Sequence, residues 1–157
     1  METSEKIEVE ESKIGYGGWL RFFRIINAIY WISGGLVIVG LGALMLFTWG
    51  ESPQEDWDIL SGVIEVIPGT IMSFLIWKVV LVQSIETPPQ LKQLLQVELA
   101  LHFIVTAFIY YAYKQGYISD GPVPILVSIV YYFIWSTYLK KSKRVKSFYG
   151  KNSANPS

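Results

Sequence analysis

The chain has 157 residues, of which 52% are hydrophobic and 17% are charged, and its formal net charge is zero. Soluble domains carry about 25% charged residues, so this composition indicates a membrane protein. The chain contains no cysteine, which excludes disulfides, thiolate catalysis and Cys-ligated zinc or iron–sulfur clusters within it.

The N-terminal residues 1–14 are rich in glutamate and poor in apolar side chains. We expect them to form a mobile acidic tail. A cleaved signal peptide opens with a basic region followed directly by an apolar one, so the first span should remain as a permanent anchor. Residues 15–149 are then expected to form one membrane domain, and residues 150–157 a disordered tail.

Four long apolar runs follow, at residues 25–49, 59–81, 94–113 and 122–139. Each has about the 17–25 residues that a helix needs to cross a bilayer. The sequence therefore predicts an all-α membrane protein with a four-helix transmembrane bundle. Thr87 and Pro88 suit the N-cap and the first position of the third helix.

Small residues in the first run predict a helix contact. Ala28, Gly35 and Gly42 are spaced by sevens and share one helix face, where a neighbouring backbone could approach closely. Gly62 and Gly69 repeat this spacing in the second run. Glycine is common in membrane helices, so chance occurrence is an equally good explanation.

The positive charges predict the orientation of the chain. They gather before the first span, at Lys6, Lys13, Arg21 and Arg24, and after the fourth, at Lys140, Lys141, Lys143, Arg144, Lys146 and Lys151. The positive-inside bias then places both termini in the cytoplasm. Anionic lipid head groups are the expected partner of the basic tail, rather than nucleic acid.

Four ionisable side chains fall within the apolar runs: Glu65, Lys78, Glu98 and His102. A charge in the middle of a bilayer costs about 2.5–3.5 kcal/mol, so each needs a partner, water or a route to the interface. We expect Lys78 to pair with Glu98 or to reach the head groups. Pro68 leaves the carbonyl of Ile64 without a donor, so Glu65 is either a proton or cation site at a helix break or a neutral, hydrogen-bonded acid.

Glu98 and His102 are four residues apart and share a helix face. This spacing suits a metal pair or a proton relay. A third ligand is missing and His102 is the only histidine, so a polar pair that holds two helices together is the favoured interpretation. The sequence predicts no bound cofactor or metal.

Two short stretches carry a family resemblance. They comprise Gly17, Gly18, Trp19 and Leu20 before the first span, and Tyr138, Ser142, Arg144, Val145 and Lys146 after the fourth. In both, the chain resembles the bacterial membrane family called domain of unknown function 2569. The resemblance implies four spans and an inner-membrane location but no activity. We expect both stretches to contact lipid head groups and residues 17–19 to pack near residues 142–148.

Two functions remain open at this point. No Gly-x-Ser-x-Gly, Walker-type or His-Glu-x-x-His motif occurs, so we expect no enzymatic activity. The first interpretation is a multi-pass accessory or interaction module that associates with a second copy or another membrane protein. The second is a small proton- or cation-coupled transporter that uses Glu65, Glu98 and His102.

Overall fold

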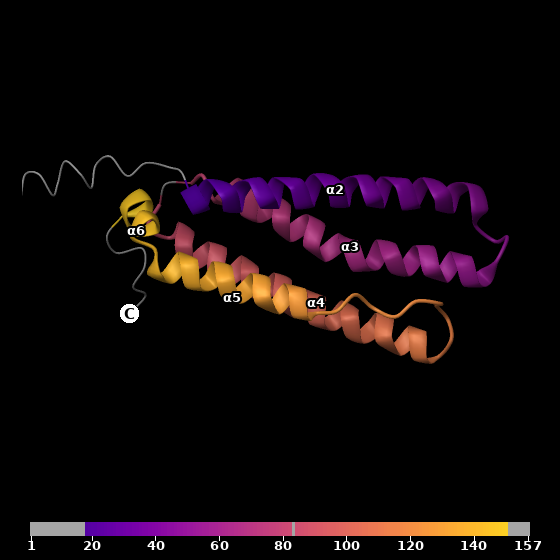
Figure 1. Cartoon of the computed structure of the whole chain (residues 1–157). Coiled ribbons are helices and arrows are strands. Elements are labelled where there is room, and N and C mark those ends of the chain that lie inside the picture. Colours follow the sequence, from indigo (N-terminus) through magenta and orange to yellow (C-terminus); the bar gives the residue numbers. More distant parts are fainter. Residues whose placement is uncertain (1–17, 83, 151–157) are drawn as a thin grey trace, which may run out of the picture.

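The computed structural model describes residues 18–82 and 84–150, and every regular element in these two ranges is a helix. The helices are α2 (Gly18–Thr48), α3 (Pro53–Val79), α4 (Thr87–Lys114), α5 (Leu126–Lys141) and α6 (Lys143–Tyr149). The four longer helices run back and forth along one axis, and the short α6 lies at one end (Figure 1). The prediction of an all-α fold is confirmed. The tails predicted at residues 1–14 and 150–157 lie outside the described residues, except Gly150.

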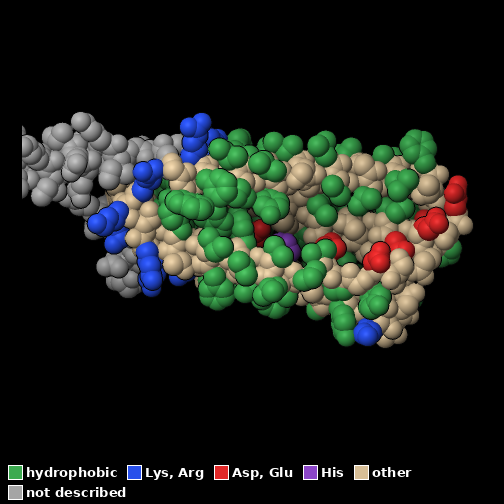
Figure 2. Space-filling view, in the orientation of Figure 1, with side chains coloured by type: hydrophobic (Ala, Val, Ile, Leu, Met, Phe, Trp, Pro, Cys, Tyr) green, Lys and Arg blue, Asp and Glu red, His purple; other side chains and the backbone are tan. Residues whose placement is uncertain are grey.

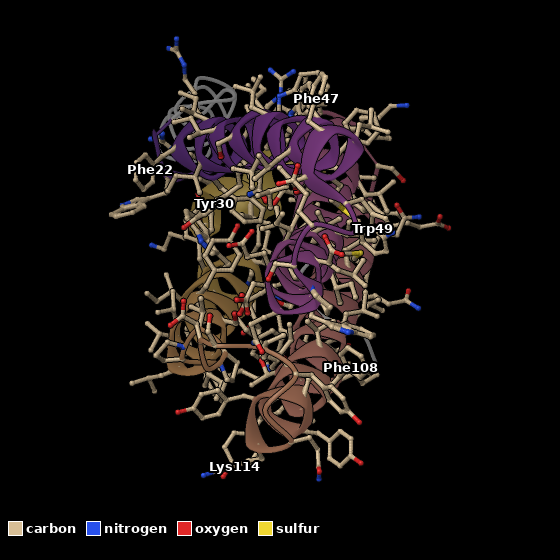
Figure 3. All side chains as sticks on the ribbon, turned by 90° about the vertical axis from the view of Figure 1, so that its right-hand side faces the viewer. Phe22, Tyr30, Phe47, Trp49, Phe108 and Lys114 are labelled. Carbon is tan, nitrogen blue, oxygen red and sulfur yellow. The ribbon has the colours of Figure 1, made fainter. Side chains whose placement is uncertain are left out.

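In the described part of the chain, three helices are long and apolar enough to cross a membrane: α2, α3 and α4, with 31, 27 and 28 residues. At 1.5 Å per residue each extends about 40 Å or more, beyond the roughly 30 Å of a hydrocarbon core. Large apolar side chains point outward from them, as Phe47 and Phe108 do in Figure 3, and Phe47 is 80% exposed. Lipid is the solvent that suits such a surface, because each exposed Å² of apolar area costs about 25 cal/mol in water. The fold is that of a membrane protein.

The fourth predicted span differs from its expectation. The apolar run begins at Pro122, but α5 begins at Leu126 and has 16 residues, which extend about 24 Å. A residue that precedes proline is disfavoured in the helical region, and Pro122 and Pro124 therefore keep Gly121 and Val123 out of the helix. A non-helical segment thus leads into a helix that is too short to cross a membrane by itself.

Helices α2 and α3 pack closely against each other at Gly34. A Cβ atom at this position would overlap the hydroxyl of Thr70 and lie 3.2 Å from its Cβ. The predicted contact face of the first run was wrong within the chain, because no described atom lies within 4 Å of a Cβ placed at Gly35 or Gly42. Neighbouring residues are rotated by about 100° around a helix, so the contact at Gly34 leaves these two glycines facing outward. The second run does make a contact, since a Cβ at Gly62 would lie 3.3 Å from Cδ1 of Leu41 on α2.

The largest buried core lies at the α6 end and takes side chains from all five helices. It includes Leu20, Phe23, Leu95, Trp135 and Val145, each 3% exposed or less. The hydroxyl of Tyr149 donates a hydrogen bond to the carbonyl of Val80, which attaches α6 to the segment after α3. This end of the bundle is tightly closed.

Hydrogen bonds join the elements at the opposite end. The carboxylate of Asp58 accepts from the backbone N–H and the hydroxyl of Ser119, both at 2.7 Å. The amide of Gln54 donates to the carbonyl of Tyr117 at 3.1 Å. These bonds attach the start of α3 to the segment that leads toward α5. Figure 2 shows Lys and Arg gathered mainly at the α6 end and most Asp and Glu toward this one.

Candidate functional site

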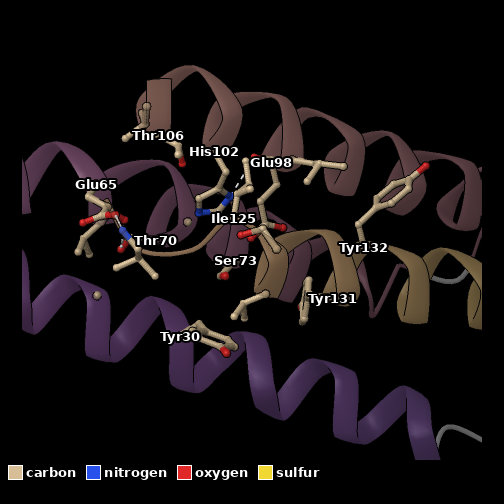
Figure 4. Close-up of a pocket in the computed structure, with 18 of the residues that line it drawn as sticks. Tyr30, Glu65, Thr70, Ser73, Glu98, His102, Thr106, Ile125, Tyr131 and Tyr132 are labelled. Carbon is tan, nitrogen blue, oxygen red and sulfur yellow. Dashed lines mark hydrogen bonds between the residues drawn. The ribbon is translucent and has the colours of Figure 1, made fainter. Parts of the chain in front are cut away.

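A cavity of about 420 Å³ lies among α2, α3, α4, α5 and the segment before α5. Its volume falls within the range of about 300–1,000 Å³ that is usual for small-molecule sites. Its polar side chains include Glu65, Thr70, Ser73, Glu98, His102 and Tyr131. Figure 4 shows Glu65 reaching in from α3, and Glu98 and His102 from α4. Three of the four ionisable residues predicted inside the apolar runs therefore share one cavity.

Glu65 holds the non-helical segment before α5. Its Oε1 accepts a hydrogen bond from the backbone N–H of Val123 at 2.9 Å. Pro122 and Pro124 have no backbone N–H, so Val123 carries the only donor of these three residues, and Glu65 satisfies it. Non-helical backbone at membrane depth is tolerated only where such groups are satisfied within the protein or line a cavity. Glu65 therefore makes a hydrogen bond across the bundle, and α3 continues through Pro68 without a break.

Glu98 is the least satisfied group of the cavity. Its Oε2 is buried and has no hydrogen-bond partner among the described residues. The predicted pair with Lys78 is not formed: Lys78 lies exposed in the last turn of α3, with its Nζ 5.3 Å from the centre of the Phe74 ring. Because α4 begins at Thr87, Glu98 lies about 16 Å along this helix. It is therefore further from the α6 end of the bundle than Lys78 in the last turn of α3. The position of Lys78 fits the alternative of reaching the head groups.

His102 contacts the backbone of Glu98 and not its carboxylate. Its Nδ1 lies 3.0 Å from the Glu98 carbonyl oxygen, and a carbonyl can only accept, so Nδ1 carries the proton. In the neutral ring Nε2 is then an acceptor. A Cβ at Gly69 would lie 3.5 Å from this Nε2, so α3 passes close to the ring. Within residues 18–82 and 84–150, no three His, Cys, Asp or Glu side chains come together to hold a metal ion.

Asn27 and Tyr131 also belong to this region, and sequence reasoning missed both. The Asn27 side chain is fully buried, and its Nδ2 donates to the carbonyl of Phe23 at 2.8 Å and to the hydroxyl of Tyr131 at 2.9 Å. Because the Tyr131 hydroxyl accepts here, its own proton is free to serve another acceptor. The sequence did contain a signal for Asn27, because a polar side chain inside an apolar run of a membrane helix needs a hydrogen-bond partner.

The electrostatic character of the cavity follows from its lining. Two carboxyl groups, Glu65 and Glu98, face it, and none of the described lining residues is Lys or Arg. The Nε2 of His102 adds an acceptor. The cavity therefore suits a positively charged or hydrogen-bond-donating group.

The cavity opens sideways between α2 and α5. Tyr30 and Val37 on α2 and Val127 on α5 line it, and they are 53%, 44% and 64% exposed. Figure 2 shows histidine and carboxyl side chains in a hollow framed by apolar ones. Toward α6 the two helices meet through aromatic rings, with the centroids of Phe23 and Trp135 4.3 Å apart. The hollow therefore ends at the closed core.

The two stretches that carry the family resemblance meet at the α6 end. Gly18 has a positive φ of 54°, and a Cβ there would overlap the Arg144 guanidinium and lie 3.2 Å from its Cζ. The ring of Trp19 lies 6.2 Å from that of Trp135. The expected proximity is confirmed for Gly18 and Arg144, while Gly17 lies outside the described residues.

The remaining residues of these stretches divide into buried and exposed ones. Leu20 and Val145 are completely buried, and Ser142 caps α6 by accepting from the backbone N–H of Val145 at 3.4 Å. The Tyr138 ring packs 5.8 Å from Trp135. Lys146 is exposed. Several of these residues thus build the core, a role that the expectation of head-group contact did not include.

No family model, curated protein or solved structure matches this chain. The fold and the site define a helical membrane protein with a polar cavity inside its helix bundle. The functional conclusion rests on the residues of that cavity.

Proposed function

We propose that this protein is a small proton- or cation-coupled carrier whose binding site is the cavity among α2, α3, α4 and α5. The observation that carries the proposal is the convergence of Glu65, Glu98 and His102 on one cavity lined by no described Lys or Arg. Intramembrane ionisable residues that face a bundle interior mark ion and substrate pathways. A bound cation supplies the partner that Glu98 Oε2 lacks among the described residues.

Coupling to protons follows from electroneutrality. A carboxyl group that gives up a proton when a cation binds leaves the charge of the cavity unchanged. Glu98 takes this role, because one oxygen of Glu65 is already engaged by the backbone of Val123. His102 lies one turn further along α4 and offers a second proton acceptor through Nε2.

The proposal includes four crossings. In it, α5 and the non-helical residues 122–124 together make the fourth crossing. About 24 Å of helix and roughly 10 Å of extended chain exceed the thickness of a hydrocarbon core. The basic α6 end then faces the cytoplasm of a bacterial inner membrane, with both termini on that side. A reporter enzyme fused after Ser157 should be active only in the cytoplasm, and activity only in the periplasm would refute this threading.

At the basic end we propose contact with anionic head groups, because Lys143 and Lys146 of α6 are exposed. Each such residue contributes about 1 kcal/mol near an anionic surface. Membership of the family called domain of unknown function 2569 stays a prediction based on the two stretches around Gly18 and Arg144.

The binding site is tested with ethidium, a permanent cation with an apolar ring system. The purified full chain in mild detergent should bind ethidium, seen as increased fluorescence anisotropy, and should release protons to an indicator dye as it does so. Glu98→Gln keeps the size of the side chain, removes its charge, and should abolish both signals. Lys78→Gln is the matched control outside the cavity and should leave them unchanged.

Transport is tested with the same probe in proteoliposomes loaded with DNA. An imposed pH gradient should drive ethidium uptake by the wild type and not by Glu98→Gln. If Glu98→Gln binds ethidium as the wild type does, or if a pH gradient does not change ethidium uptake, the proposal of a carrier is refuted.

A second candidate function is an accessory module that associates within the membrane. The outward-facing Gly35 and Gly42, which share one face of α2, favour it, because no described atom lies within 4 Å of a Cβ at either position and small residues allow membrane helices to approach closely. Since the chain contains no cysteine, Gly42→Cys would form a disulfide dimer in native membranes if a second copy packs there. Leu36→Cys, which is 70% exposed and lies about 120° around α2 from Gly42, is the control. Equal crosslinking of both variants, or none, would count against a specific contact.

A further inference from the structure

Resting on the proposed function, we propose that the ligand is an amphiphilic amine that enters the cavity sideways from the lipid, between α2 and α5. Its ammonium group would bind at Glu98 and His102, and its apolar tail would remain between the two helices. Two independent features carry the inference: the position of the opening and the balance of donors and acceptors inside.

The opening lies at the depth of the hydrocarbon core. Tyr30 and Val37 are 12 and 19 residues into the 31-residue α2, or about 18 and 28 Å from its start. Its rim is mainly apolar: Val37 and Val127 are 44% and 64% exposed, and the exposed hydroxyl of Ser33 between Tyr30 and Val37 donates to the carbonyl of Tyr30. A molecule that enters past this rim comes from the lipid and not from bulk water. It therefore needs an apolar part that is soluble in the hydrocarbon core.

The inside of the cavity selects the head group. Glu98 Oε2 is buried without a partner among the described residues, and Nδ1 of His102 already donates to the Glu98 carbonyl. Thr70 uses its hydroxyl proton on the carbonyl of Val66 at 2.9 Å, which leaves its oxygen to accept. A primary ammonium carries three donors and a positive charge, and so satisfies several of these acceptors at once.

The same groups exclude other amphiphiles. A phosphate or carboxylate head group would face Glu65 and Glu98 with no cationic side chain among the described lining residues. Like charges in a water-poor site repel strongly. The cavity therefore favours amines without phosphate, such as long-chain alkylamines, over phospholipids and fatty acids.

The test uses the full chain in nanodiscs of zwitterionic lipid and a long-chain primary amine with a photoreactive diazirine in its tail. Illumination should attach the probe to peptides of α2 and α5 around Val37 and Val127. The same tail with a carboxylate head should label them much less. Glu98→Gln should lower labelling by the amine to the level of the carboxylate probe.

Two matched pairs test the route of entry. Val37→Trp and Val127→Trp fill the rim and should suppress labelling in nanodiscs. Val39→Trp and Val130→Trp replace exposed valines of the same helices that do not line the cavity, and should label like the wild type. Each folded variant is verified by its circular dichroism and its elution as a single species.

The outcomes separate this inference from the proposed function. If ethidium binding in detergent requires Glu98 but the rim variants label normally in nanodiscs, lateral entry is refuted and the cation site stands. If both head groups label equally, the ligand class is refuted. If ethidium does not bind at all, the carrier itself is refuted.

Discussion

The hydrogen bond between Glu65 and Val123 gives the sharpest prediction of the structure. Replacing Glu65 by Met removes the acceptor and keeps the length of the side chain, which leaves the Val123 N–H without a partner. At an N···O distance of 2.9 Å, a bond to a carboxylate contributes about 1.5–3 kcal/mol. Since 1.4 kcal/mol is a factor of ten, local opening should become about 10- to 150-fold more frequent.

Hydrogen–deuterium exchange measures this opening directly. Pro122 and Pro124 carry no amide hydrogen, so Val123 has the only exchangeable backbone hydrogen of these three residues. Its exchange in nanodiscs should accelerate strongly in Glu65→Met and less in Glu65→Gln, whose amide oxygen still accepts. Exchange in the core around Leu95 should not change. An unaltered rate at Val123 in Glu65→Met would refute the role assigned to Glu65.

Two further changes test the packing of the bundle by unfolding in mixed micelles. Gly34→Val should lower the free energy of unfolding by about 1–3 kcal/mol, because the new side chain overlaps Thr70. Gly35→Val should be nearly neutral, because no described atom lies within 4 Å of a Cβ at that position. Equal effects of the two substitutions would contradict the assigned contact. Tyr149→Phe should cost about 1 kcal/mol by removing the hydrogen bond to the Val80 carbonyl, and unchanged stability would show that this bond contributes nothing.

Hydrophobicity predicted the helices well where nothing interrupts it. The runs at 25–49 and 59–81 lie within α2 and α3 except for their last one or two residues, and the run at 94–113 lies entirely within α4. The predicted start of the fourth run was wrong because the run includes Pro122 and Pro124, whose rings prevent the chain from entering a helix there. The start of α4 was one residue off: Glu86 is the N-cap, and Thr87, the first helical residue, donates its hydroxyl to the carbonyl of Val82.

The cavity could be predicted only in part. The cost of charge in lipid identified Glu65, Glu98 and His102 as residues that need an explanation. Their meeting depends on how α3 and α4 are offset along the membrane, and neither helix sequence contains that offset. The partner of Glu65 was hidden for another reason: it is a backbone group of Val123, and a side-chain pattern says nothing about which backbone donors lack a helical acceptor.

The central claim is that a polar cavity lies inside the membrane-embedded bundle. Because the chain lacks cysteine, a single cysteine introduced in the cavity is the only thiol that can react. A thiol reacts through its thiolate, which requires a polar environment. Ser128→Cys, in the cavity lining, should react with N-ethylmaleimide in intact membranes much faster than Val130→Cys, two residues along the same helix outside the lining. Equal and slow reaction at both positions would contradict the cavity.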